Sequence, residues 1–224
     1  MDFQRTAKNR VVRVPERGRY DQATIYQIID EALICHVGLV EANQPAVIPT
    51  LHARKDNEIL LHGAASSRLI KYVQSGREVC VAMTLVDGLV MARSVFHHSV
   101  NYRSVVLFGR GRLVPAEDKL AYLEYFTNYL IPGRWAEVRP PNETELKATA
   151  IVTIPIELAS AKVRIGPPGD EPEDMALPVW AGVLPIKPQF LPPENDPQLE
   201  DNIPVPDHIL DYVRKRNKPT ERTD

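Results

Sequence analysis

The sequence predicts a mainly β, α+β fold: short antiparallel strands form a small barrel or sandwich, and helices lie around it. Two observations support this class. At least five apolar segments with strand character lie between residues 34 and 114. Close turns at 43–45 and 55–57 connect neighbouring segments, which is typical of an antiparallel meander. Only one early helix interrupts the strands, so most of this region belongs to the sheet.

Composition and charge narrow the functional class. The chain has 224 residues, 44% hydrophobic and 25% charged, as an ordinary globular protein has. The formal net charge is -2, which makes nucleic acid a poor partner. No apolar run reaches the roughly 18–20 residues of a membrane span, so no membrane association is expected. Cys35 and Cys80 lie in apolar stretches without metal-ligand spacing, which predicts buried thiols in the cytoplasm and no bound metal.

The expected elements follow from the spacing of apolar residues. Helices have periods of three and four, and strands are rich in β-branched residues. We expect helices at 21–33, 67–75, 117–130, 142–149 and 207–216, and strands at 34–40, 46–54, 58–61, 78–92, 103–114 and 150–161.

Three regions are expected along the chain. A polar N-terminal arm covers 1–19, a barrel domain covers 20–165, and an extension covers 166–224. Twelve of the twenty prolines lie from residue 165 onward, which argues against regular sheet there. We expect this tail to pack as an extended segment on the barrel or on a neighbouring subunit.

The segment 62–68, His-Gly-Ala-Ala-Ser-Ser-Arg, joins a predicted strand to a predicted helix. Ser66 or Ser67 suits the N-cap of that helix. A helix start, serine hydroxyls and the Arg68 guanidinium together form a plausible phosphate site. The alternative is an ordinary capped surface helix with a solvated arginine.

Two further clusters carry polar groups. Residues 94–104, which we expect to form a loop between strands, contain two histidines, three serines, an asparagine, a tyrosine and an arginine, next to Arg93. The alternative is a polar hairpin without a ligand.

Thr50 and His52 lie two apart on one predicted strand, and His62 ends the next. A hairpin of these strands would bring the two histidines close. A structural role is the commoner one for a strand histidine.

These segments resemble the pyridoxamine 5'-phosphate oxidase-like split-barrel superfamily, in its flavin-nucleotide-binding branch, which includes the nitroimidazole-resistance proteins. The specific parts are His-His-Ser-x-Asn-Tyr-Arg-Ser at 97–104 and Trp-Ala-Gly-Val-Leu-Pro at 180–185. The resemblance covers most of 17–185, with weaker matching segments at 17–21, 34–38, 45–49, 61–63, 66–68, 87–90, 93–94, 132–134, 161–164 and 166–168.

The resemblance implies a split β-barrel of about six antiparallel strands that forms a homodimer. It implies FMN, or alternatively FAD, at the dimer interface, with Ser66, Ser67 and Arg68 on the phosphate. It gives no catalytic residue. The flavin contacts it implies are Pro49, Thr50, His52, His62, Gly63, Ser66, Ser67, Arg68, Met83, Thr84, His98, Ser99, Tyr102, Arg103 and Trp180.

Three functions remain open at this point. The first is an oxidoreductase that reduces a small electrophile, of the nitro or quinone type, with a nicotinamide as electron donor. The second is a flavin carrier or sensor without turnover. The third is a haem-binding split barrel in which His97 or His98 supplies an axial ligand. The C-terminal arginine and histidine pattern of the pyridoxal-making oxidases is absent, so oxidation of pyridoxamine 5'-phosphate is not expected.

Overall fold

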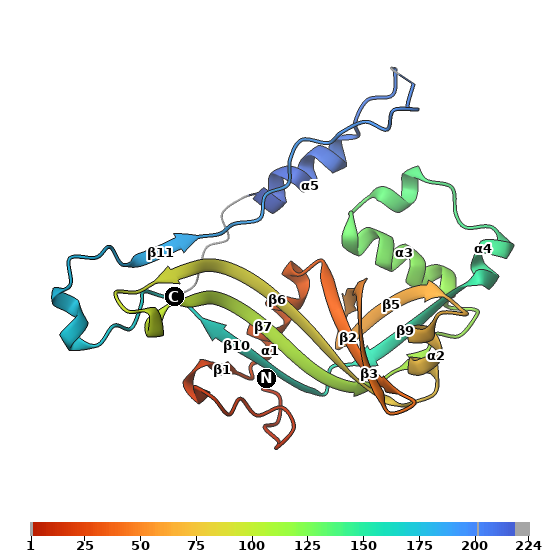
Figure 1. Ribbon diagram of the computed structural model, residues 1–224. Coiled ribbons are helices and arrows are strands. Elements are labelled where there is room, and N and C mark those ends of the chain that lie inside the picture. The colour runs from red at the N-terminus through yellow and green to blue at the C-terminus, as the bar shows by residue number, and fades with distance from the viewer. Residues whose placement is uncertain (1, 201, 218–224) are drawn as a thin grey trace.

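The frame of the molecule is two antiparallel sheets, shown by a computed structural model that describes residues 2–200 and 202–217 (Figure 1). The larger sheet has the order β1-β10-β7-β6-β2-β3, with β11 also paired to β6, and the smaller has the order β4-β5-β9-β8. The α+β class with antiparallel strands is confirmed, but the expected count of about six strands is wrong. The strands are β1 (Gly18–Arg19), β2 (Ile34–Glu41), β3 (Gln44–Leu51), β4 (Ala53–Lys55), β5 (Glu58–Ala64), β6 (Glu78–Met91), β7 (Ser99–Arg110), β8 (Arg112–Leu113), β9 (Thr149–Pro155), β10 (Leu158–Arg164) and β11 (Gly182–Pro185).

Five α-helices flank the sheets, close to their expected positions. Side-chain caps begin α1, α2 and α4: Asp21 accepts a hydrogen bond from the Thr24 N–H at 2.8 Å, and Asn142 and Glu145 form a capping box. Figure 1 shows α3 and α4 beside the smaller sheet, at the end of the molecule away from β11. The helices are α1 (Gln22–Glu31), α2 (Arg68–Gln74), α3 (Lys119–Leu130), α4 (Glu143–Ala148) and α5 (Asp207–Asn217).

The main core fills the space between the two sheets and α1. Ile25, Ile28 and Ile29 form the buried face of α1, as the periodicity of 21–33 predicts. They pack with fully buried residues of both sheets, such as Leu61 and Ile154. A second, smaller cluster lies under α3 and consists of Ala53, Leu60 and Phe126 with four partly buried neighbours. The core thus places α3 on the outer face of the smaller sheet.

Two expected strands are each divided between the sheets. The segment 46–54 forms parts of β3 and β4, and the break falls at His52. The segment 150–161 forms β9 and part of β10, and the break follows Pro155. Both halves of each segment have strand composition, so the apolar pattern does not reveal that the chain passes from one sheet to the other. The expectation of single strands at these positions was therefore wrong.

The long β6–β7 ribbon contains a bulge. Its register shifts between Val86 and Gly88. A Cβ atom at Gly88 would lie 2.9 Å from the Leu184 carbonyl oxygen, so β11 approaches β6 where a side chain is missing. The strand expected from residue 103 begins earlier, so residues 99–102, expected in a loop, are the start of β7, and the connection is only 92–98.

The described parts of the N-terminal arm and of the tail both make contacts with the barrel. Phe3 and Asn9 of the N-terminal arm are buried, and Asn9 Nδ2 donates to the Ala159 carbonyl at 3.0 Å. The tail, expected to contain no regular sheet, adds β11 to β6 and then runs away from the barrel to α5 (Figure 1). Arg216 of α5 donates to the Glu31 carbonyl at 3.1 Å. In the ranges described, no helix has the length and apolar character needed to cross a membrane.

Candidate functional site

The passage from β5 into α2 presents the residues predicted to hold a phosphate. The Ser67 hydroxyl caps α2 by accepting from the Ile70 N–H at 3.3 Å. Ser66 and Arg68 are exposed beside it, and Arg68 has no ion pair with any residue that the structure describes. The capped helix is confirmed, and phosphate binding at this passage stays a prediction.

The other predicted flavin contacts lie on several strands and differ in how far they are exposed. Pro49 is exposed and Thr50 half-buried on β3, while Thr84 is exposed on β6. Met83 is fully buried within the main core, so its side chain does not reach the surface. Trp180 is 64% exposed just before β11. The remaining members, Gly63, Ser99 and Tyr102, lie half-buried on β5 and β7.

Arg103 has its side chain fixed within the fold. Its Nε and Nη2 donate to the two Asp87 carboxylate oxygens at 3.0 Å each, and its Nη1 donates to Glu31 at 2.6 Å. The guanidinium therefore joins β7 to the bulge of β6 and to the end of α1. Three of its five donors are used internally, which leaves little capacity for a phosphate.

The connection 92–98 is held by the chain that follows β10. Arg93 donates from its backbone N–H and from Nη1 to the two oxygens of Asp170, both at 2.9 Å. His98 Nδ1 accepts from the Ala92 N–H at 3.1 Å, and His97 Nε2 lies 3.4 Å from a Glu171 oxygen. Phe96 is 88% exposed at the tip, an arrangement that favours contact with a ligand or a second chain.

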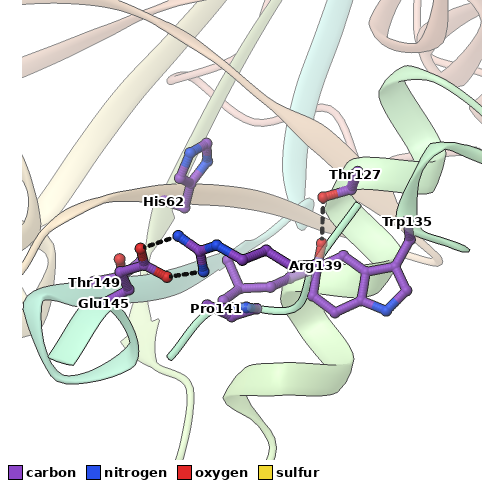
Figure 2. A pocket seen from close by; sticks show the side chains of 8 residues that line it. His62, Thr127, Trp135, Arg139, Pro141, Glu145 and Thr149 are labelled. Carbon is purple, nitrogen blue, oxygen red and sulfur yellow. Dashed lines mark hydrogen bonds and ion pairs between the residues drawn. The ribbon is translucent and has the colours of Figure 1, made fainter. Parts of the chain in front are cut away.

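A pocket of about 390 Å³ lies between the smaller sheet and the segment that carries α3 and α4 (Figure 2). Its volume falls within the roughly 300–1,000 Å³ of small-molecule and cofactor sites. Of its lining, the sequence singled out only His62. The pocket is lined by His62, Leu123, Thr127, Trp135, Arg139, Pro141, Glu145 and Thr149.

His62 brings an unused imidazole to this pocket. Its ring packs edge-on against Phe126 with the centroids 4.5 Å apart, and its Nδ1 is buried without a hydrogen-bond partner in the part of the chain that the structure describes. Burial lowers the pKa of His62 below its ordinary value, so the ring is neutral at neutral pH. A neutral imidazole is the form that ligates a metal ion.

His52 lies in a different environment from His62. It is fully buried, and its Nε2 lies 2.9 Å from the Ile29 carbonyl oxygen of α1. His62 contacts α3 instead, so the two histidines expected to be neighbours interact with different helices. His52 has the structural role that is common for a strand histidine.

Arg139 and Glu145 form an ion pair at the edge of the pocket. Arg139 donates from both terminal nitrogens to the two carboxylate oxygens, at 2.8 and 2.6 Å, and Figure 2 shows the two groups facing each other. The Arg139 guanidinium, together with the Asn142 N–H, holds the pKa of Glu145 at about 2. The arginine side chain is 69% exposed, so it lies in solvent at the pocket mouth while Glu145 and the Pro140 carbonyl occupy its terminal nitrogens.

The burial of His52 predicts a pH dependence of stability. Burial lowers the pKa of His52 against the opposing effect of the Ile29 carbonyl, so the folded protein binds this proton less readily than the unfolded chain. As the pH falls below about 6.5, the unfolded state takes up the proton first and the free energy of unfolding decreases. Urea unfolding at about pH 7.5 and about pH 5.5 should show this loss.

The variant His52→Gln tests this origin, because glutamine can still donate to the Ile29 carbonyl but does not titrate. Its urea midpoint should fall less between the two pH values than that of the wild type. His36→Gln, at an exposed histidine on β2, should leave the full loss in place. An equal loss in all three proteins would show that His52 is not the origin.

Comparison with known proteins identifies the family. The family model described as pyridoxamine 5'-phosphate oxidase matches residues 21–163. A search of proteins with curated functions found no match. Among solved structures, the flavocytochrome Anf3 from Azotobacter vinelandii is 40% identical, with a TM-score of 0.88 over 92% of this chain and 96% of that one.

Two further structures extend the comparison. An FAD and haem binding protein from Mycobacterium smegmatis is 31% identical, with a TM-score of 0.85 over 88% of this chain and 97% of that one. A putative 5-nitroimidazole antibiotic resistance protein from Bacteroides thetaiotaomicron is 19% identical, with a TM-score of 0.56 over 65% of this chain and 86% of that one. The last likeness concerns the fold alone.

Proposed function

Because this chain belongs to the pyridoxamine 5'-phosphate oxidase-like family, we propose that it is a redox protein that binds both a flavin and a haem. The observation that carries the proposal is its 40% identity to a flavocytochrome across 92% of the chain. That likeness reaches well past residues 21–163, the part that the family model matches. The FAD and haem binding protein from M. smegmatis supports the same pair of cofactors.

The residues of this chain fit the two cofactors at different places. Ser66 and Arg68 offer exposed donors for the flavin phosphates, and the pocket at His62 offers an imidazole with a buried, unpaired Nδ1 beside Leu123 and Trp135. When bound, a flavin exchanges electrons with an organic donor and a haem iron takes them up singly. The protein would supply position, charge and exclusion of water. Of the two flavins, we propose FAD, because the M. smegmatis relative is described by that cofactor.

We further propose that two copies assemble with the flavin between them. Several apolar side chains on the larger sheet and its connections are exposed in the single chain, among them Val47 at 65% and Phe96 at 88%. Covering them by a second copy would remove apolar surface from water. Sedimentation equilibrium should give twice the mass of one chain; a single-chain mass with flavin bound would contradict the assembly.

An absorption spectrum of the purified protein, with heat release and mass identification of the chromophores, tests the cofactor proposal. We expect flavin bands together with a Soret band, and release of FAD. Flavin bands without haem uptake on titration would show that the protein binds a flavin alone. In that case the oxidoreductase of the nitro or quinone type, with a nicotinamide donor, would be the function to test. Uptake of neither cofactor would overturn the proposal.

Arg68→Ala is expected to weaken flavin binding by about 1.5–3 kcal/mol, because it removes a charge-assisted hydrogen bond to a phosphate. Flavin fluorescence during titration measures the change. Arg77→Ala is the matched control: Arg77 is also exposed near α2, but its guanidinium stacks over Tyr72. Equal affinity in the Arg68 variant and the wild type would place the phosphate elsewhere.

A further inference from the structure

Haem iron in proteins is held by a small set of side chains, of which histidine is the commonest in globins and peroxidases. The chain has six histidines, and all of them lie in the ranges that the structure describes. They differ in whether a ring nitrogen already faces another group, and a nitrogen that does so is less available to an iron.

Four of the six histidines have a ring nitrogen directed at another group. His52 Nε2 is used by the Ile29 carbonyl and His98 Nδ1 by the Ala92 N–H. His97 faces Glu171 at 3.4 Å, and His208 faces Glu137 at 3.3 Å. His36 lies exposed on the surface of β2, and none of these five lines the pocket beside α3.

We propose that His62 is an axial ligand of the haem iron and that the pocket beside α3 is the haem site, an inference that rests on the proposed function. Its ring lines the pocket, packs on Phe126 and has a buried Nδ1 without a partner among the described residues. Histidines that ligate metals use one ring nitrogen for the metal and the other for a hydrogen bond. Because no hydrogen bond to Nδ1 fixes the His62 ring, the ring can turn to direct a nitrogen at the iron without breaking one.

The pocket walls suit a flat apolar macrocycle. Leu123 of α3, Trp135 and Pro141 contribute apolar surface, and Phe126 supports the His62 ring from behind. Such surroundings exclude water from an iron site and affect its potential. The segment from α3 to α4, which the sequence identified only as two helices, would cover a haem bound in this pocket.

The charge at the pocket mouth suits the haem propionates. Arg139 is exposed there and presents a planar guanidinium, which pairs with carboxylates through two parallel hydrogen bonds. Its present partner, Glu145, shows that the Arg139 guanidinium can hold a carboxylate in this position. Arg139 would hold a propionate at the pocket mouth by exchanging Glu145 for it.

The test compares haem spectra of the reconstituted full chain. His62→Ala should lose the wild-type Soret position and bind haem at least tenfold more weakly, and added imidazole should restore the spectrum. His62→Met should keep haem with a shifted Soret band. His36→Ala, which changes an exposed histidine on the other sheet, should be indistinguishable from the wild type. Flavin titration of each variant confirms that it is folded.

The outcomes separate this inference from the proposed function. A wild-type protein that takes up no haem overturns the proposed function and the inference with it. Haem uptake by the wild type with an unchanged spectrum in His62→Ala overturns the inference alone. A spectrum lost in His97→Ala or His98→Ala but kept in His62→Ala would move the ligand to the connection 92–98.

Arg139→Ala provides a second readout for the same pocket. Haem affinity should fall by about threefold to fivefold, because an exposed ion pair contributes little. Arg112→Ala is the matched control, since Arg112 is also an exposed arginine paired with a glutamate on the smaller sheet, and it does not line the pocket. Equal affinity in the Arg139 variant and the control would remove Arg139 from the site.

Discussion

Phe126→Ala is expected to lower the free energy of unfolding by about 3–5 kcal/mol, the usual cost of removing a buried phenylalanine ring. Phe126 is 4% exposed and is the member of the smaller cluster that α3 contributes. Because its ring also packs on His62, the cavity would open directly behind the proposed haem ligand. Urea unfolding of the protein without cofactors measures the loss.

The control for this variant is Leu120→Ala, on the same helix at a position that is 44% exposed. Its effect should stay within about 0.5 kcal/mol. A loss of less than about 1 kcal/mol for Phe126→Ala would mean that α3 does not depend on this cluster. The position of α3 over the smaller sheet would then need another explanation.

Ile154→Ala is expected to destabilise the protein by about 2–5 kcal/mol. Ile154 is fully buried on β9 and belongs to the main core. Cβ atoms built at Gly109 and Gly111 would lie 2.8 and 3.1 Å from Ile154 side-chain atoms, so the side chain packs directly on the bend between β7 and β8. Its removal leaves a cavity that the flanking backbone cannot fill without moving.

The graded substitution Ile154→Val separates cavity formation from other effects. It should cost about 0.5–1.5 kcal/mol, because it removes a single methylene group. Chemical unfolding of both variants gives the comparison. Similar losses for valine and alanine would contradict the packing described here and indicate a change in the backbone of β9.

The elements that the sequence predicted well are those with local signals. Asp21, Ser67 and Asn142 each cap a helix through a side-chain hydrogen bond, and such a bond depends on only a few neighbouring residues. The bulge of β6 lies at Gly88, a residue type that is common where another backbone approaches a strand closely. Gly111 connects β7 to β8.

The features that the sequence did not predict depend on contacts between distant segments. The break at His52 reflects its bond to the Ile29 carbonyl, 23 residues earlier. The pairing of β11 with β6 joins a proline-rich tail to the bulged ribbon, and composition alone argued against it. Strand periodicity is the same in either sheet, so it contains no information on which sheet a strand joins.

In the candidate site, too, local signals were predicted and contacts between distant segments were not. His62 was identified because it ends a strand next to a probable phosphate site, but the pocket around it was not anticipated. Trp135 and Arg139, between two predicted helices, were the available signal for it. Arg103, predicted to contact the flavin, has its fork used by Asp87 and Glu31, partners 16 and 72 residues away. Spacing along the chain does not reveal such partners.

The most direct test of the central claim is anaerobic photoreduction of the protein carrying both cofactors. Light and a sacrificial donor reduce the flavin, and the haem bands are followed in the same cuvette. We predict that the ferrous haem spectrum appears as the flavin is reduced, and that protein loaded with haem alone stays ferric under the same light. Bleaching of the flavin bands while the haem remains ferric would contradict electron transfer between the two cofactors.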